Sequence, residues 1–398
     1  FRDGRFFAQV RVRAEADALS VNGVPAEGSA DGEFRAMVPL DGLRGRLEAR
    51  DGSGGCAAIT VFRLRGAEKT YRFTVDDCIR CFEDLTRRQE CYRSIFENPY
   101  LAVFARAHER YGSKVHLNVF YESEDGSFNL SMMTDRFRDE FIRNSDWLSL
   151  TFHARREFPN APYRTASYEE IYRDCVQCTR EIIRFAGREV LRDTTTLHFG
   201  ACTADGVRAL RAFGFCGLCG YLTFAPDGET LVSYHLTRDQ VAHAETREGW
   251  YDAAEDVVFA KLDFVLNDPA LTADRVAPFL DELAKRPHER ELIQMVIHEQ
   301  YFYPDYPLYE PDYAQRIWEM ARWMHEHGYR SASLSEMIRT ILDHRASANI
   351  TQYELFGLRD ADSGSGEPLG SLGEVPAEQG IGADLGLREH HPGAHRAP

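Results

Sequence analysis

From Tyr71 onward, short apolar stretches with a strand-like pattern alternate with amphipathic helical stretches. The segments 115–121, 147–152 and 292–297 are rich in β-branched and aromatic residues, and each is followed by a helical pattern or a long connection. This alternation is typical of an α/β fold in which crossover helices join parallel strands. It predicts a distorted (β/α) barrel of seven or eight strands over residues 67–346.

The segments on either side of the predicted barrel differ in character. Residues 1–66 contain short alternating strands, among them 7–12, 33–38 and 58–62, separated by turns that include Gly-rich clusters. This pattern predicts a small all-β accessory domain, either an antiparallel sheet or a β-sandwich. Residues 347–398 turn to Gly, Ser, Pro and Glu. We expect a disordered tail there, because the segment has too little apolar surface to bury.

The acidic balance of the chain disfavours several classes of partner. The formal net charge is −16, whereas nucleic acids and anionic membranes attract basic proteins. No stretch approaches the roughly 18 consecutive apolar residues of a membrane span. The chain starts at Phe1 without a signal-like stretch, and its nine cysteines do not resemble a disulfide scaffold. These features slightly favour a cytoplasmic location, with truncation at the N-terminus as the alternative.

Three Cys-x-x-Cys pairs are present: Cys78 and Cys81, Cys175 and Cys178, and Cys216 and Cys219. Two such pairs can bind zinc tetrahedrally. However, the first two pairs lie in helical patterns, where cysteines three positions apart serve as small buried apolar residues, and the third lies in a strand-like run. We therefore expect reduced core cysteines rather than a zinc or redox site.

Polar residues end most of the predicted strands. They are Asp76, Asp77, His153, His198, Asp263 and His298. In a parallel barrel the carboxyl ends of the strands converge on one face, where active sites lie. Aspartate and histidine suit zinc or another borderline divalent ion. The sequence therefore predicts a metal or acid–base site on this face.

The segment Thr74-Val75-Asp76-Asp77 resembles the first motif of the polysaccharide deacetylase family (carbohydrate esterase family 4-like, NodB-homology domain), which is usually Thr-Phe-Asp-Asp-Gly. The resemblance implies the distorted barrel of that family. It also implies that Asp76 is the catalytic base and that Asp77 is a metal ligand.

The later motifs of the family follow in the right order. In the second motif His153 matches the first metal-binding histidine, but Glu157 stands where the second is expected. The third motif corresponds to residues 196–200, which lack the usual Arg and contain His198. The last motif ends at His298, the family's general acid. The third metal ligand is therefore either Glu157 or His198, and His198 is preferred because it lies directly at a strand end.

The resemblance implies a metal-dependent hydrolase, with zinc as the expected cofactor, that removes acetyl groups from a carbohydrate. Tyr301 and Tyr303 follow the last motif and are expected to stack on sugar rings, although a packed aromatic lid is an equal alternative. Two other functions stay open. One is an inactive carbohydrate-binding or scaffold protein on the same fold, and the other is hydrolysis of a non-sugar amide.

Overall fold

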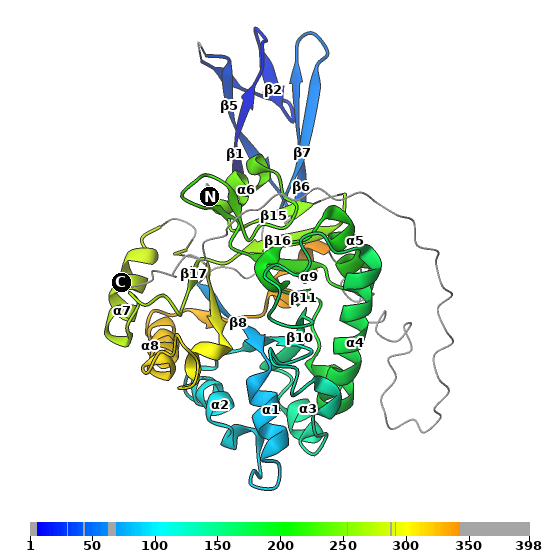
Figure 1. The fold of residues 1–398 in the computed structure, drawn as a ribbon. Helices are drawn as coiled ribbons and strands as arrows, with labels where there is room; N and C mark the ends of the chain where they lie inside the picture. Colours follow the sequence, from blue (N-terminus) through cyan, green and yellow to red (C-terminus); the bar gives the residue numbers. More distant parts are fainter. Residues whose placement is uncertain are drawn as a thin grey trace, which may run out of the picture.

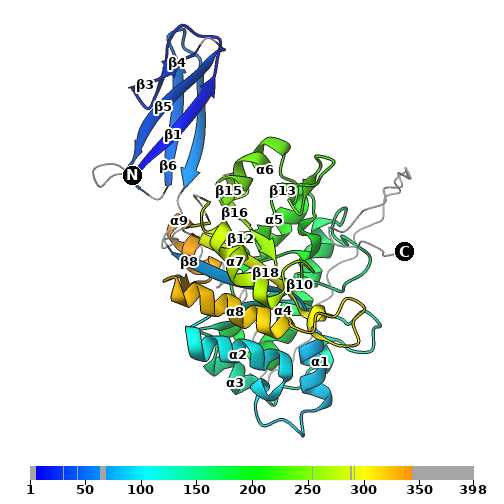
Figure 2. The same cartoon turned by 90° about the vertical axis from the view of Figure 1, so that its left-hand side faces the viewer.

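The structure is a computed structural model that describes residues 6–29, 31–42, 44–62, 69–252, 254–286, 289–290 and 292–342. The tail predicted over 347–398 lies outside these residues. The fold is mixed α/β: helices surround parallel strands, and a separate group of N-terminal strands projects from one end (Figures 1 and 2).

Two antiparallel sheets make up the N-terminal part. One contains β1 (Phe6–Arg13), β5 (Glu33–Leu40) and β4 (Glu27–Gly28); the other contains β3 (Val24–Pro25), β2 (Leu19–Val21), β6 (Arg44–Asp51) and β7 (Cys56–Phe62). Buried and less buried positions alternate along β5, as the period-two pattern predicts. The inward side chains, including Val21, Val38 and Leu47, form a small core of their own.

The larger sheet is parallel and has β8 (Thr70–Cys78) at its centre. On one side of β8 lie β9 (Val115–Phe120) and then β10 (Leu148–Ala154), and on the other lie β18 (Leu292–His298) and β17 (Phe264–Val265). A short sixth strand, β19 (Arg330–Ser331), also pairs with β8. Every residue of β8, β9 and β10 is buried, as expected for parallel strands covered on both faces.

A second sheet contains β11 (Thr194–Thr195), β12 (Gly217–Gly220), β16 (Val257–Lys261) and β15 (Gly249–Asp252), and only the β15–β16 pairing is antiparallel. Strand β16 continues almost directly into β17 of the larger sheet. At the other edge the hydroxyl of Thr151 on β10 donates to the carbonyl oxygen of Thr194 on β11. The chain and side-chain hydrogen bonds thus connect the two sheets. An antiparallel pair, β13 (Thr223–Phe224) and β14 (Thr230–Leu231), lies apart from both.

Nine helices lie in the part of the chain that the structure describes. They are α1 (Arg80–Arg87), α2 (Pro99–Tyr111), α3 (Arg138–Arg143), α4 (Tyr168–Ala186), α5 (Ala204–Phe213), α6 (Arg238–Glu245), α7 (Ala273–Leu283), α8 (Tyr313–Glu326) and α9 (Leu334–Leu342). Helix α2 shows why its boundaries were readable: the Asn98 side chain accepts from two backbone N–H groups, Pro99 opens the first turn and Gly112 closes the helix at φ 69°. Among the helices described, none combines the length and apolar character needed to cross a bilayer.

Candidate metal centre

Two adjacent aspartates near the end of β8 both lie in the buried interior. In a regular strand, neighbouring side chains point to opposite faces. Here the pairing of β8 with β9 shifts: Val75 pairs with Leu117 and Cys78 with Val119, so β8 has one residue more than β9 over this stretch. Asp77 has a left-handed backbone, with φ 64°. This bulge turns the side chains of Asp76 and Asp77 toward the same region, which adjacent positions in a regular strand could not do.

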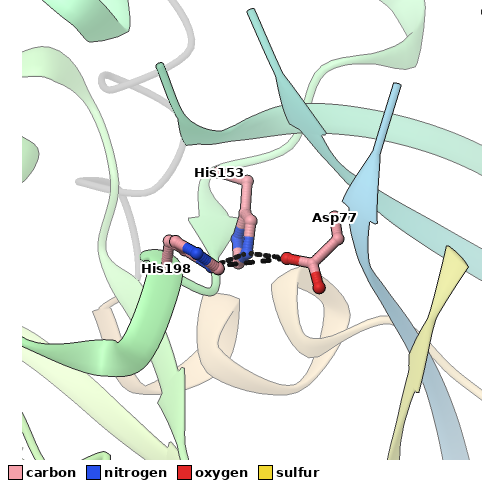
Figure 3. Close-up of side chains that lie close together, drawn as sticks. All are labelled: Asp77, His153 and His198. Atoms are coloured by element: carbon pink, nitrogen blue, oxygen red, sulfur yellow. Dashed lines mark hydrogen bonds and ion pairs between the residues drawn. The ribbon is translucent and has the colours of Figure 1, made fainter. Parts of the chain in front are cut away.

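The Asp77 carboxylate meets two imidazole rings (Figure 3). Its Oδ1 atom lies 3.1 Å from His153 Nε2 and 3.3 Å from His198 Nδ1, and the two nitrogens are 3.1 Å apart. His153 lies in β10, where the pairing with β9 again shifts its register. His198 begins a short 3-10 turn (His198–Gly200) after β11. All three side chains, called the Asp77 group below, are buried.

The hydrogen bond that each histidine ring makes on the side away from Asp77 fixes which of its two nitrogens carries the proton. Nδ1 of His153 faces the carbonyl oxygen of Thr196, and Nε2 of His198 lies 3.2 Å from the carbonyl oxygen of Glu157. A carbonyl oxygen only accepts, so each of these ring nitrogens carries the proton. In a neutral ring the other nitrogen then presents a lone pair. Two nitrogen lone pairs and one carboxylate oxygen therefore converge, and they require a proton or a cation between them.

This donor set fits a divalent metal ion. Zinc bonds of about 2.0–2.2 Å in tetrahedral geometry separate the ligand atoms by roughly 3.3–3.6 Å. The separations in the Asp77 group, 3.1 to 3.3 Å, are close to that range. Metal-binding histidines commonly donate their second N–H to a backbone carbonyl, as both rings do here. The group can hold a metal ion through Asp77, His153 and His198.

The pKa values of the Asp77 group also favour a positive charge next to the Asp77 carboxylate. Burial by itself would raise the pKa of Asp77, but the hydrogen bonds with His153 and His198 hold it well below its usual value. Burial disfavours the charged form of His198, yet the adjacent Asp77 carboxylate raises the pKa of this ring above its usual value. The site therefore keeps an ionised carboxylate in a buried position.

Asp76 has a different environment from its neighbour. Burial raises the pKa of its carboxyl group above the usual value, although His153 and His298 act in the opposite direction. Its Oδ1 atom accepts a hydrogen bond of 2.6 Å from Asn118 Nδ2. Asn118 cannot flip without losing contacts, because its Oδ1 accepts from the backbone N–H of Thr196 and from the hydroxyl of Thr195. Asn118 therefore supplies a fixed donor to Asp76.

Asn118 was not recognised from the sequence. The signal available in the sequence was an amide in the middle of the otherwise strand-like run 115–121. The structure shows that this position is fully buried. A buried amide in a strand needs several partners, and that requirement points toward a polar interior. Here the partners of Asn118 include Asp76, which receives its hydrogen bond.

His298 ends β18 directly beside the aspartates. It is the register partner of Asp76, and its Nδ1 atom lies 2.7 Å from Oδ1 of Asn267. Burial lowers the pKa of the ring below its usual value, although Asp77 and Asp76 oppose that shift. The two strand ends thus place a second titratable group next to Asp76.

The remaining predicted residues lie at different distances from the Asp77 group. The Glu157 carboxylate is 3.9 Å from His198 Nε2, on the opposite side of that ring from the atom facing Asp77, and burial together with Asp77 raises its pKa to about 8. The Tyr301 ring lies 6.2 Å from the His298 ring. The Tyr303 hydroxyl instead donates to Glu299, and its ring packs beneath Arg80. A role in substrate binding stays a prediction for both tyrosines.

The two residues that follow His298, Glu299 and Gln300, contact the segment that begins with Asp77. Gln300 Nε2 donates to the second oxygen of Asp77 at 2.7 Å. Glu299 is fully buried, and its carboxylate accepts from the backbone N–H groups of Ile79, Arg80 and Cys81 at 2.6 to 2.8 Å. Helix α1 has no side-chain cap from its own Ile79, and Glu299, directly after the neighbouring strand β18, caps it instead.

Replacing Glu299 with alanine is expected to lower the free energy of unfolding by about 3–5 kcal/mol, because three buried backbone donors would lose a charged acceptor. Denaturant titration measures this change. Glu109→Ala, an exposed site on α2, is the matched control and should change stability by less than about 0.5 kcal/mol. Equal stabilities of the two variants would contradict the capping role.

The paired cysteines are buried as predicted, but the first pair does not lie within one helix: Cys78 ends β8 and Cys81 lies in α1, whereas Cys175 and Cys178 both lie in α4. All nine are free thiols, and both members of each Cys-x-x-Cys pair are buried. Burial raises the pKa of Cys78, Cys81, Cys175 and Cys178 well above the usual value, which disfavours the thiolate that metal binding needs. Asp263, a further strand-end residue, forms an ion pair of 3.1 Å with Lys261 and so has a structural partner.

Comparison with known proteins adds little to this description. No protein-family model and no curated protein matches the chain. One solved structure that resembles it is a crystal structure of a Salmonella typhimurium protein provisionally named an alpha amylase, with 11% identity and a TM-score of 0.24 over 88% of this chain and 84% of the other. A likeness this weak supports no inference about fold or function.

Proposed function

We propose that this chain is a metal-dependent hydrolase that removes acetyl groups from a carbohydrate. The observation that carries the proposal is the Asp77 group: three lone-pair atoms converge in a buried position, and a second carboxylate, that of Asp76, lies on the adjacent residue. A ligand triad beside a carboxylate with a raised pKa is the arrangement needed for metal-assisted hydrolysis. The resemblance of the motifs to polysaccharide deacetylases directs the choice of substrate.

Asp77, His153 and His198 would hold the ion, and their mixed nitrogen and oxygen donors favour zinc. When bound, the ion would act as a Lewis acid and lower the pKa of a water molecule. Asp76 accepts the proton of the attacking water at the carboxylate that Asn118 orients. His298 donates a proton to the leaving group, and the contact between its Nδ1 atom and Asn267 orients the ring. A lowered pKa makes its protonated form a stronger acid.

The proposal includes a barrel. In this barrel the two sheets, β10-β9-β8-β18-β17 and β11-β12-β16, would join into one distorted ring. Two features support it: β16 continues almost directly into β17, and the Thr151 hydroxyl on β10 donates to the Thr194 carbonyl oxygen on β11. In such a ring the strand ends that carry Asp77, His153 and His298 open on one face. Tyr301, beside His298, is the better placed of the two tyrosines to contact a sugar.

A second candidate function is a binding or scaffold protein without activity. It is favoured by Glu157, whose carboxylate stands outside the Asp77 group although the family motif has a ligand at this position. Hydrolysis of a non-sugar amide would use the same residues. Elemental analysis and acetate release separate the three. We expect one zinc, cobalt, manganese or nickel ion per chain, and acetate release from acetylated oligosaccharides that stops when the metal is removed.

Protein without stoichiometric metal would support the binding or scaffold function. Metal-dependent activity on simple acetamides but not on acetylated sugars would support the amide hydrolase. Activity that is undiminished after complete chelation would contradict all metal-dependent versions of the proposal.

Two substitutions test whether His198 or Glu157 is the third metal ligand. His198→Ala is expected to weaken metal binding by more than about a hundredfold, because it removes an atom 3.3 Å from Asp77 Oδ1. Glu157→Gln keeps the backbone carbonyl that accepts from His198 and is expected to change metal affinity by less than about threefold. Competition with a chromogenic chelator measures both affinities. A large loss in Glu157→Gln with little change in His198→Ala would reverse the assignment.

A further inference from the structure

A polar cavity lies at the opposite ends of the strands that carry Asp77 and His153. Its volume is about 440 Å³. Its walls come from the first residues of β8, β9, β10 and β11 and from the first turn of α9. The Asp77 group belongs to the other ends of β8 and β10, so the cavity is separate from that site.

A buried guanidinium group lines the inner part of this cavity. Arg72 is 3% exposed, and its donors reach only neutral acceptors: Gln294 Oε1 at 2.6 and 3.2 Å, Thr74 Oγ1 at 3.1 Å and Cys219 Sγ at 3.1 Å. Within the described part of the chain, no carboxylate lies within ion-pairing distance of Arg72. A buried charge without a counterion costs several kcal/mol, so this position favours an anion.

Neighbouring groups add to the positive field inside the cavity. His116, on the cavity wall, has a pKa lowered to about 3, first by burial and then by the charges of Arg72 and Arg192. The Arg192 side chain lies on the same wall and donates to backbone carbonyls, including that of Ser145. The N-terminal turn of α9 contributes the positive end of its dipole, although Glu336 already accepts from the Ser333 N–H.

The acidic residues of the lining are exposed to solvent, whereas Arg72 is buried. Asp146, Glu189 and Glu336 are all exposed, and Glu336 forms an ion pair with Lys114. Solvent screens exposed charges far more than buried ones. The inner part of the cavity is therefore electropositive even though the full lining contains both signs.

We propose that this cavity binds a small molecule bearing an oxyanion, a phosphate or a carboxylate, with the oxyanion on the Arg72 guanidinium. The contacts with Gln294, Thr74 and Cys219 engage four of the five N–H groups of Arg72, so the guanidinium offers an oxyanion its positive charge and one further N–H donor. Hydroxyl groups of Ser149, Thr194 and Ser335 line the same space and supply further hydrogen bonds. The site does not depend on the proposed hydrolase function.

Isothermal titration with inorganic phosphate and, separately, with acetate tests the proposal in the wild-type protein. We expect saturable binding at one site, and the tighter of the two anions identifies the class of oxyanion. Arg72→Gln should weaken that binding by about tenfold or more, because it removes the charged donors. Arg247→Gln, at an exposed arginine beyond α6, is the matched control and should leave it unchanged.

Asp77→Ala separates this site from the metal centre: binding of the anion should persist in that variant even if metal binding is lost. Equal affinity in wild type and folded Arg72→Gln, or no saturable binding of either anion, would overturn the proposal. A selenate soak of wild-type crystals gives a test that does not depend on the folding of any variant. An anomalous selenium peak beside Arg72 is expected; peaks elsewhere, an adventitious ion only, would refute the site.

Discussion

Replacing Asp77 with alanine is expected to weaken metal binding by more than about a hundredfold and to reduce hydrolysis to the background rate. The Oδ1 atom of Asp77 is the only carboxylate oxygen in the group of three converging atoms. Without it, two buried imidazole nitrogens face each other at 3.1 Å with no anion to balance a cation. Metal content by mass spectrometry and acetate release measure the two losses.

The backbone of Asp77 calls for a matched control. Its φ of 64° is unfavourable for alanine, and asparagine tolerates this region better. Asp77→Asn therefore removes the negative charge of the carboxylate but still allows the bulge and the hydrogen bond from Gln300. It should fold like the wild type and still lose most of its metal. Full metal occupancy in Asp77→Asn and full activity in Asp77→Ala would together exclude Asp77 as a ligand.

Replacing Asp76 with asparagine is expected to lower kcat by about 10²–10⁴-fold while metal affinity changes by no more than a fewfold. Asp76 contacts Asn118 and is not part of the Asp77 group, so its loss removes the proton acceptor and leaves the ligands in place. Steady-state kinetics of the metal-loaded variant, together with its metal content, show whether the substitution affects kcat or metal binding.

Asn118→Ala provides the corresponding positioning test. It removes the donor to Asp76 and should lower kcat by about tenfold, which is the value of one hydrogen bond to a charged group. Metal content should stay near that of the wild type. If Asp76→Asn kept full activity with bound metal, Asp76 would not be the base, and the proposed mechanism would fail even if the metal site were correct.

The wild-type chain thus separates two adjacent carboxylates into different environments. Asp77 has a pKa well below its usual value because two histidines contact it, whereas burial raises the pKa of Asp76. In a straight strand the two side chains would point to opposite faces, and only one could reach the site. The bulge between Val75 and Cys78 is therefore a requirement of the proposed chemistry rather than a local irregularity.

The sequence by itself was sufficient for features that depend on local pattern. The alternation of strands and helices after Tyr71 predicted the parallel pairing of β8, β9 and β10, because runs of buried β-branched and aromatic residues bounded by helices rarely fold otherwise. The caps of α2 and α4 were also readable, since Asn98 and Ser167 act on their own next turn. Strand-end histidines were readable as a set, which brought His153 and His198 into consideration.

Only the tertiary structure decided how those residues meet. The register shift at Asp77, the contact of His198 with Asp77, the cap that Glu299 supplies to α1 and the donor from Asn118 to Asp76 all join segments 40 or more residues apart, and up to 220 residues apart. No local pattern encodes such contacts, because they depend on which strands become neighbours and on their relative register. A one-residue difference in that register would turn a ligand away from the site, so the sequence named the candidates and the packing of the strands selected among them.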